Sequence, residues 1–136
     1  EMKNLALLAL FVFATPLAYG ETLIQFDCQF PFYSDEDGAK KTQKETMSVA
    51  YILTQADDGS WSGILSGNAG PTKLLVSPGI GTYNLLEFTK GGIVNVTTLQ
   101  PNEGLTRAKA VHSRHVVLPL YDMWMPTQWY GDCLIK

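Results

Sequence analysis

The sequence predicts an all-β fold, namely a small up-and-down antiparallel barrel of seven or eight strands, with a β-sandwich as the alternative. Short segments in which apolar and polar residues alternate recur along the chain, and this two-residue period is typical of strands. Turn-forming sequences separate nearly all of these segments and contain most of the 12 glycines and 7 prolines. No segment has a helical period, and short strands with turns between them favour a barrel or a sandwich.

The start of the chain is organised like a secretory signal peptide. Lys3 precedes an apolar run over 5–13, and small residues lie at the expected cleavage point. The run is shorter than the roughly 20 apolar residues that cross a bilayer. We therefore expect residues 1–20 to be removed and residues 21–136 to form a single domain, with no membrane span in the mature chain. A buried N-terminal helix and an uncleaved anchor are the alternatives.

In the first half of the domain, each predicted strand ends at a proline or at a glycine-containing turn. Ile24 and Phe26 alternate with polar residues in the first strand, which Pro31 is expected to end. A charged loop follows, and the second strand then places Tyr51 and Leu53 on one face. The segments predicted here are strands 22–28, 46–55, 61–66 and 72–77, with the charged loop over 34–45.

In the second half, glycine- and proline-containing turns again bound the predicted strands. Tyr83 and Leu85 share one face of the fifth strand, and Val94 and Val96 share one face of the sixth. An irregular aromatic loop is expected over 119–126, before a short last strand. The strands predicted here are 82–89, 93–99, 105–118 and 128–135.

The two cysteines favour a barrel over a sandwich. Cys28 ends the first predicted strand and Cys133 lies on the last, and an exported protein is expected to pair them. A disulfide needs Cα atoms about 4.4–6.8 Å apart. First and last strands are neighbours when a meander closes on itself, and closure also removes the exposed sheet edges. A catalytic thiol is the alternative, and it would need a partner histidine.

The charge balance argues against a nucleic-acid partner. The chain has 10 Lys and Arg against 13 Asp and Glu, a net charge of −3, which gives no indication of a basic face for nucleic acid. The sequence predicts no cofactor. It predicts no metal site either, because His112 and His115 would point to opposite faces of a strand and lack a third ligand.

The segment 110–115 contains both histidines and the first candidate contact residues. His112 and Arg114 share one strand face, where their side chains could donate hydrogen bonds to an anionic group. A hydrolase that uses His112 or His115 is an alternative. Ser113 and His115 share the other face, but side chains two residues apart on a strand stand roughly 6–7 Å apart. That separation is too large for the hydrogen bond between a nucleophile and its base.

The segment 121–130 contains four aromatic residues and two methionines around a proline. Segments of this composition are enriched at contact surfaces and pockets. The alternative is a lid that folds onto the barrel end and buries its rings as core. Trp124 is the better candidate for an exposed ring, and Trp129 is the better candidate for a buried one. The residues expected to contact a ligand or partner are His112, Arg114, Tyr121, Trp124 and Trp129.

Two stretches of the C-terminal third, 110–115 and 126–133, resemble a group of small exported bacterial proteins. Those proteins share an HSRH segment and a later P-[ST]-Q-x-Y-G-x-C ending, and they have an early cysteine after the leader. The resemblance implies an exported, β-rich domain. It transfers no catalytic residue to this chain.

The leading functional hypothesis is an exported domain, periplasmic or secreted, that binds an unknown small ligand or envelope protein and is not an enzyme. The first alternative is an accessory subunit of an envelope complex that docks through the aromatic segment 121–130. The second alternative is the hydrolase that uses His112 or His115.

Overall fold

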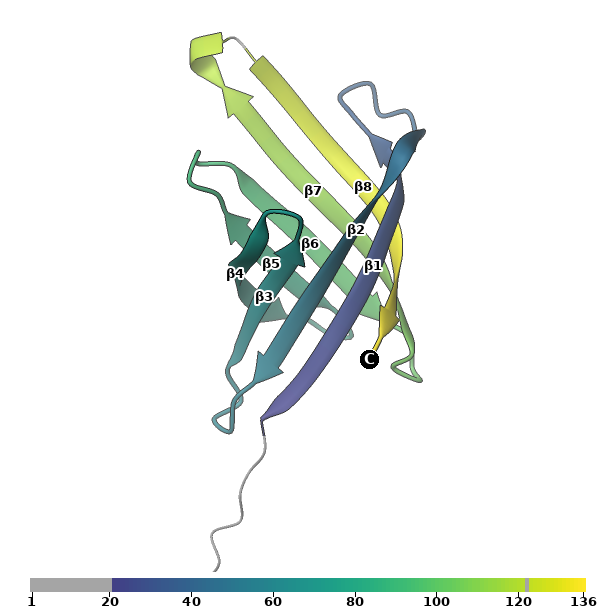
Figure 1. Cartoon of the computed structure of the whole chain (residues 1–136), viewed down its shortest axis with the longest axis vertical. Coiled ribbons are helices and arrows are strands. Elements are labelled where there is room, and N and C mark those ends of the chain that lie inside the picture. The colour runs from purple at the N-terminus through teal and green to yellow at the C-terminus, as the bar shows by residue number, and fades with distance from the viewer. Residues whose placement is uncertain (1–20, 122) are drawn as a thin grey trace, which may run out of the picture.

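The computed structural model describes residues 21–121 and 123–136, so the predicted signal peptide over 1–20 lies outside the described residues. The described residues form a closed barrel of antiparallel strands in chain order, in which the last strand pairs with the first (Figure 1). The predicted barrel is thus confirmed and the sandwich is excluded. No helix in this part of the chain has the length and hydrophobicity that a membrane crossing requires. The elements are β1 (Thr22–Ser34), β2 (Lys41–Gln55), β3 (Trp61–Gly67), β4 (Gly70–Pro78), β5 (Tyr83–Phe88), β6 (Val94–Pro101), β7 (Arg107–Leu118), the 3-10 turn η1 (Pro119–Tyr121) and β8 (Met123–Ile135).

The interior of the barrel is filled by the inward-facing set of alternating side chains. Successive residues of a strand point to opposite faces, so every second residue enters the interior and the others form the outer wall. The interior is mainly apolar and holds the largest buried side chains of the described residues. These fully buried side chains are Phe26, Cys28, Phe30, Tyr51, Leu53, Leu85 and Leu99.

Strand β1 continues through Pro31, which corrects the expectation that this proline ends the strand. The register of β1 shifts between Phe30 and Phe32 against β2 and between Gln29 and Phe32 against β8, so Pro31 lies in a β-bulge. A bulge leaves one residue outside the ladder, and a proline can occupy that position because it has no N–H to pair. The strand then extends to Ser34, and the predicted charged loop over 34–45 shrinks to the residues between β1 and β2.

Gly131 on β8 lies against this bulge, and its missing side chain makes the close approach possible. A Cβ built at Gly131 would lie 2.2 Å from the Gln29 carbonyl oxygen and 2.8 Å from Cδ1 of Phe30. The neighbouring atom is backbone, so it cannot turn aside as a flexible side chain could. The bulge in β1 can therefore approach β8 this closely only because residue 131 is a glycine.

We expect Gly131→Ala to lower the free energy of unfolding by at least about 1–3 kcal/mol, the usual range for overpacking a filled site. The matched control is Gly67→Ala, because a Cβ at Gly67 has no heavy atom within 4 Å. Urea unfolding of both variants measures the difference. Equal midpoints for the two variants would contradict the close contact at Gly131.

The disulfide joins the first and last strands of the barrel. Cys28 lies directly opposite Cys133 in the ladder between β1 and β8, with their Cα atoms 4.0 Å apart, and the predicted pairing is confirmed. Backbone hydrogen bonds between Gln25 and Lys136 continue the ladder at the chain end. An ion pair between Lys136 and Asp27 joins the same two strands. These contacts close the barrel between β1 and β8, the two neighbouring strands that no loop connects.

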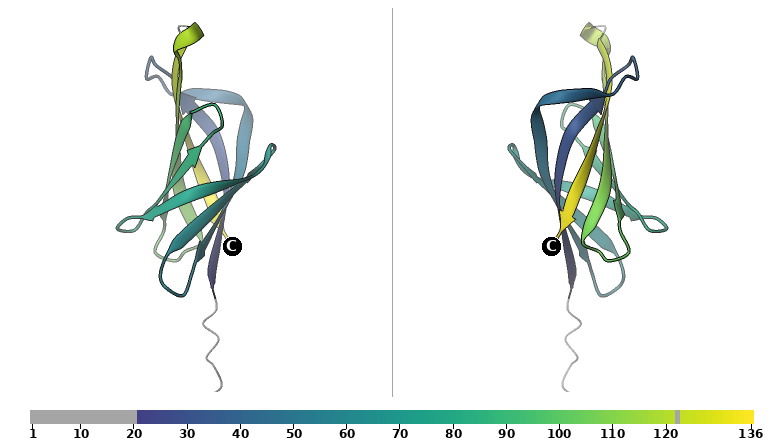
Figure 2. Two further views of the ribbon diagram at one scale, coloured as in Figure 1. Left: turned by 90° about the vertical axis from the view of Figure 1, so that its left-hand side faces the viewer. Right: turned by 90° about the vertical axis from the view of Figure 1, so that its right-hand side faces the viewer.

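The predicted irregular loop over 119–126 is instead mostly a two-stranded ribbon. β8 begins at Met123, and the short η1 turn follows directly on β7. β6 pairs with β7 only as far as His115, and β1 pairs with β8 only as far as Gln128. Within residues 116–127, which we call the arm, residues 116–118 pair with residues 123–125 and with no other strand, so the described part of the arm projects beyond the barrel (Figures 1 and 2). Apolar and polar residues do not alternate in the sequence of the arm, because both faces of a free ribbon can be apolar.

The barrel has two distinct ends. The arm projects from one end, which we call the arm end and which also carries the loop between β1 and β2. The other end, called the turn end, carries the β2–β3, β4–β5 and β6–β7 loops and the C-terminus (Figure 1).

Candidate functional site

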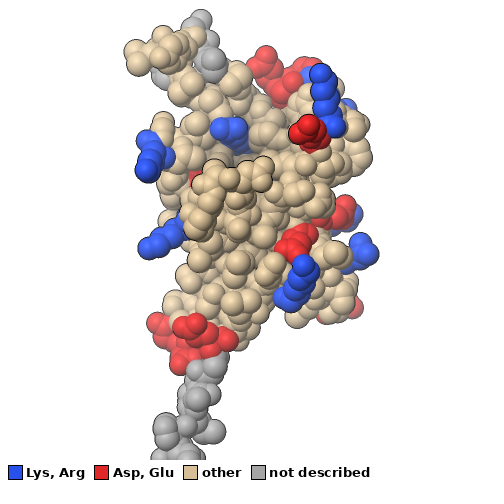
Figure 3. Space-filling view, viewed as in Figure 1, with Lys and Arg blue, Asp and Glu red and all other residues tan. Residues whose placement is uncertain are grey.

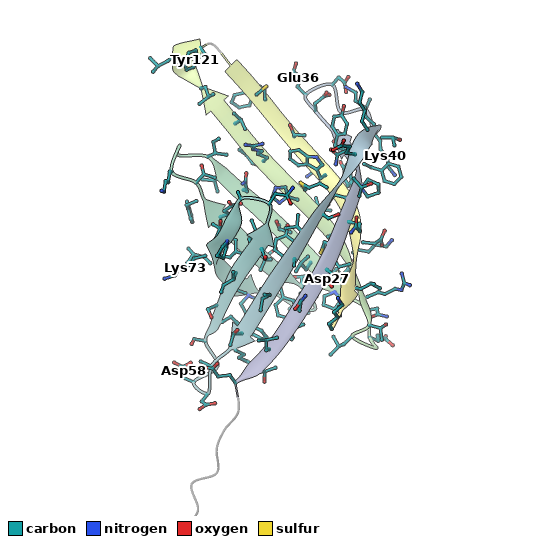
Figure 4. All side chains as sticks on the ribbon, viewed as in Figure 1. Asp27, Glu36, Lys40, Asp58, Lys73 and Tyr121 are labelled. Atoms are coloured by element: carbon teal, nitrogen blue, oxygen red, sulfur yellow. A yellow bond between two sulfur atoms is a disulfide. The ribbon has the colours of Figure 1, made fainter. Side chains whose placement is uncertain are left out.

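The five predicted contact residues fall into two groups that the structure places differently. Strand alternation and pairing bring His112, Arg114 and Trp129 to the inner face of β7 and β8, near the arm end. Tyr121 and Trp124 lie on the arm and are largely exposed, as Figure 4 shows for the labelled Tyr121. The structure therefore contains an inner polar group and an outer arm in place of one continuous site.

The inner group is organised around His112. This side chain is only 9% exposed, and its Nδ1 lies 2.7 Å from the Thr97 hydroxyl. Thr97 in turn lies 3.2 Å from the Tyr51 hydroxyl, so three strands contribute to one hydrogen-bonded chain. The His112 ring packs against Trp129, with centroids 5.5 Å apart, and against Phe30 at 6.1 Å.

Burial favours the uncharged forms of His112 and Tyr51 in the hydrogen-bonded chain. Desolvation is the main cause of a lowered pKa at His112; the Glu87 carboxylate opposes it and Arg114 adds to it. Desolvation also raises the pKa of Tyr51 to about 12, although its hydrogen bond with Thr97 acts in the opposite direction. A neutral ring that accepts the Thr97 proton at Nδ1 carries its own proton on Nε2. The arrangement is therefore a stable set of neutral donors and acceptors.

The lowered pKa of His112 predicts that acid destabilises the fold. The unfolded chain binds this proton more readily, so the contribution of neutral His112 is complete above the ordinary pKa near 6.5 and is lost as the pH falls below it. We expect His112→Asn, which keeps an acceptor for Thr97, to flatten the fall in stability between about pH 7 and pH 5. Urea unfolding at each pH measures this, and the exposed His115→Asn is the control, which should retain the wild-type slope. Parallel curves for all three proteins would refute the assignment.

A second polar row lies nearer to the arm end, and of its members only Arg114 was predicted from the sequence. Glu87, Asn95 and Arg114 are direct neighbours across β5, β6 and β7. The Asn95 amide nitrogen donates to Glu87 at 2.9 Å, while its buried Oδ1 has no partner among the described residues. Arg114 is exposed and shares the inner face with His112, as predicted. A polar residue at an inward position of a strand was the only available signal for this row.

A polar cleft lies on the outer wall at the base of the arm. Its volume is about 360 Å³, and its lining includes Ser113 and His115. The Ser113 hydroxyl accepts a hydrogen bond from Gln128 at 3.0 Å, and the Gln128 carbonyl accepts one from Tyr130 at 2.8 Å. Among the described residues no hydrogen bond joins a serine to a histidine. Ser113, the serine between the two histidines, is therefore paired with Gln128 and with neither histidine.

The two histidines lie on opposite sides of β7, as predicted. His112 enters the core, whereas His115 is exposed on the outer wall. Within the part of the chain that the structure describes, no three His, Cys, Asp or Glu side chains are grouped closely enough to hold a metal ion.

The arm carries most of its apolar side chains in contact with solvent. Leu120 is 96% exposed and Trp124 is 63% exposed, and Val117 lies opposite Trp124 in the ladder. Asp122, the only charged residue in the sequence of the arm, lies outside the described residues. The exposed apolar side chains of the arm are Val117, Leu120, Tyr121, Trp124 and Met125.

Comparisons of this chain with family models, with curated proteins and with solved structures find no match.

Proposed function

We propose that this chain is an exported, non-enzymatic binding domain that docks onto a partner protein of the cell envelope through the arm. The observation that carries this proposal is the exposure of five large apolar side chains on a ribbon that projects beyond the barrel. Contiguous apolar surface of this kind is unfavourable in water and marks interaction sites in soluble proteins. In Figure 3 the described part of the arm shows no charged side chain.

The residue types and the shape of the arm both favour a protein partner. Tryptophan and tyrosine are the residues that most often dominate the energy of a protein interface. A small ligand is usually bound in a concave site, whereas a projecting ribbon can itself enter a groove of a partner. Tyr121 and Trp124 are thus the expected anchors of this contact.

Two features support export. The leader-like start of the sequence is one, and the resemblance to exported bacterial proteins agrees with it. The disulfide between Cys28 and Cys133 is the other, because disulfides persist in oxidising compartments.

Site-specific cross-linking in the exporting host tests the docking surface. A photo-reactive amino acid at Tyr121 should give a discrete adduct with another protein, whereas the same group at Ser62, exposed on the outer wall, should give none. Trp124→Ser should abolish the adduct. Leu75→Ser is the matched control, since Leu75 on the outer wall is 62% exposed and Trp124 is 63% exposed. It should leave the adduct unchanged.

Four outcomes would overturn the proposal. An adduct of twice the mass of the chain would show that the arm contacts a second copy. Adducts only to lipid would show a membrane contact. Equal labelling from Tyr121 and Ser62, or no adduct from either position, would show that the arm is not a specific docking surface.

A further inference from the structure

A hollow at the turn end lies far from the arm and has the dimensions of a ligand site. Its volume is about 470 Å³, within the range of roughly 300–1,000 Å³ that small-molecule pockets occupy. The start of β3, the β4–β5 loop, the start of β5 and the β6–β7 loop provide its lining. We call it the aromatic hollow, and the lining residues that matter here are Trp61, Pro78, Tyr83, Pro101, Glu103 and Leu105.

Two aromatic rings form a corner in the aromatic hollow. Trp61 and Tyr83 are partly buried, with ring centroids 5.1 Å apart and planes inclined at 62°. Behind them the fully buried Phe26 lies 5.9 Å from Tyr83 at 61°, so the core holds the corner in place. The face of such a ring carries negative electrostatic potential and attracts a cation within about 6 Å.

The charge of the lining also favours a cation. Among the described residues, Glu103 is the one carboxylate of the lining, and the lining contains no Lys or Arg. Asp57 and Asp58 lie on the β2–β3 loop at the same end, where Figure 4 labels Asp58 and Figure 3 shows a group of acidic side chains. Arg107, which follows the β6–β7 loop, lines a different hollow with Lys109.

The rim of the aromatic hollow is held in an unusual backbone conformation. Leu105 has a φ of 51°, the left-handed region that a bulky residue rarely adopts. The Asn102 side chain fixes this turn by accepting hydrogen bonds from the backbone N–H groups of Thr106 at 2.9 Å and Arg107 at 3.0 Å. The turn therefore keeps Leu105 and Glu103 at the edge of the hollow.

We infer that the aromatic hollow binds a small organic cation, of the methylated ammonium type, between the Trp61–Tyr83 corner and the Glu103 carboxylate. Methyl groups on an ammonium are apolar enough for the prolines and Leu105 at the edge, and the positive charge suits the ring faces. This inference is independent of the arm, because the two surfaces lie at opposite ends of the barrel.

The test compares choline with its neutral carbon isostere, 3,3-dimethyl-1-butanol, on the full exported chain. The two molecules have nearly the same shape, so a difference in affinity reports the charge. The indole N–H resonance of Trp61, followed by NMR, should shift and saturate with choline. The isostere should bind at least tenfold more weakly, while the resonances of Trp124 and Trp129 stay in place.

Substitutions at Glu103 and at Trp61 separate the contributions of the charge and of the ring to binding. Glu103→Gln removes a charge from an exposed loop side chain and should weaken choline binding severalfold without changing the response to the isostere. Glu45→Gln on β2, also exposed, is the matched control and should change neither. Trp61→Leu removes the ring and should abolish choline binding. Trp61→Phe keeps a ring and should retain weakened binding if Trp61→Leu fails to fold.

Equal affinity for choline and the isostere would show a merely apolar pocket and overturn the inference. No saturable shift of Trp61 with millimolar choline would overturn it as well. So would choline binding that Glu103→Gln and Trp61→Phe both leave unchanged.

Discussion

Replacing Cys28 and Cys133 together with alanine should lower the free energy of unfolding by about 2–5 kcal/mol, the usual effect of removing a native disulfide from a small secreted domain. The two residues are 105 positions apart in the sequence, so the cross-link restricts most of the unfolded domain. In the chain-entropy account, a loop of this length gives roughly 4–5 kcal/mol.

The measurement is urea unfolding of the oxidised protein, of the double variant and of the wild type in reductant. The last two should coincide, because both lack the cross-link. Peptide mapping without reductant should recover one linked pair of peptides from the wild type. Two free thiols, or a double variant as stable as the oxidised protein, would contradict the role of the disulfide.

The barrel was predictable because its signals are local. Alternation marked the strands, and glycine and proline marked the turns, so the eight-stranded order follows from segments read one at a time. The cysteines supplied the one long-range constraint, since Cys28 and Cys133 place β1 beside β8. Pro31 misled the prediction because a proline ends a regular strand but is tolerated in a bulge. The bulge itself depends on Gly131, which is distant in sequence.

For the candidate site, the sequence could predict only which residues of a single strand share a face. Alternation within β7 correctly placed His112 and Arg114 on one face and His115 on the other. The partners of His112 come from β2 and β6, and only the register between strands brings Tyr51 and Thr97 to it. A shift of one residue would turn every one of these side chains to the other face, and the register depends on the hydrophobic pattern of several strands together with the turns between them.

Trp129→Ala should lower the free energy of unfolding by roughly 3 kcal/mol, near the lower end of the range for truncating a buried tryptophan. Trp129 packs against the core and against His112, and it is only partly exposed. Its removal would leave space above the hydrogen-bonded pair of His112 and Thr97. Chemical unfolding should show a lower midpoint, and the loss should be smaller in a His112→Asn background, where the contact between the two rings is already absent.

Trp124→Ala is the matched comparison, because it removes the same type of side chain, an indole ring, from the arm. Trp124 is 63% exposed on a ribbon whose residues pair only with each other, so the change should stay within about 0.5 kcal/mol. The same variant should still lose the cross-link from Tyr121, because an exposed anchor contributes to docking and little to folding. If Trp124→Ala destabilises the barrel as much as Trp129→Ala, the arm is a structural lid in solution and cannot be the docking surface.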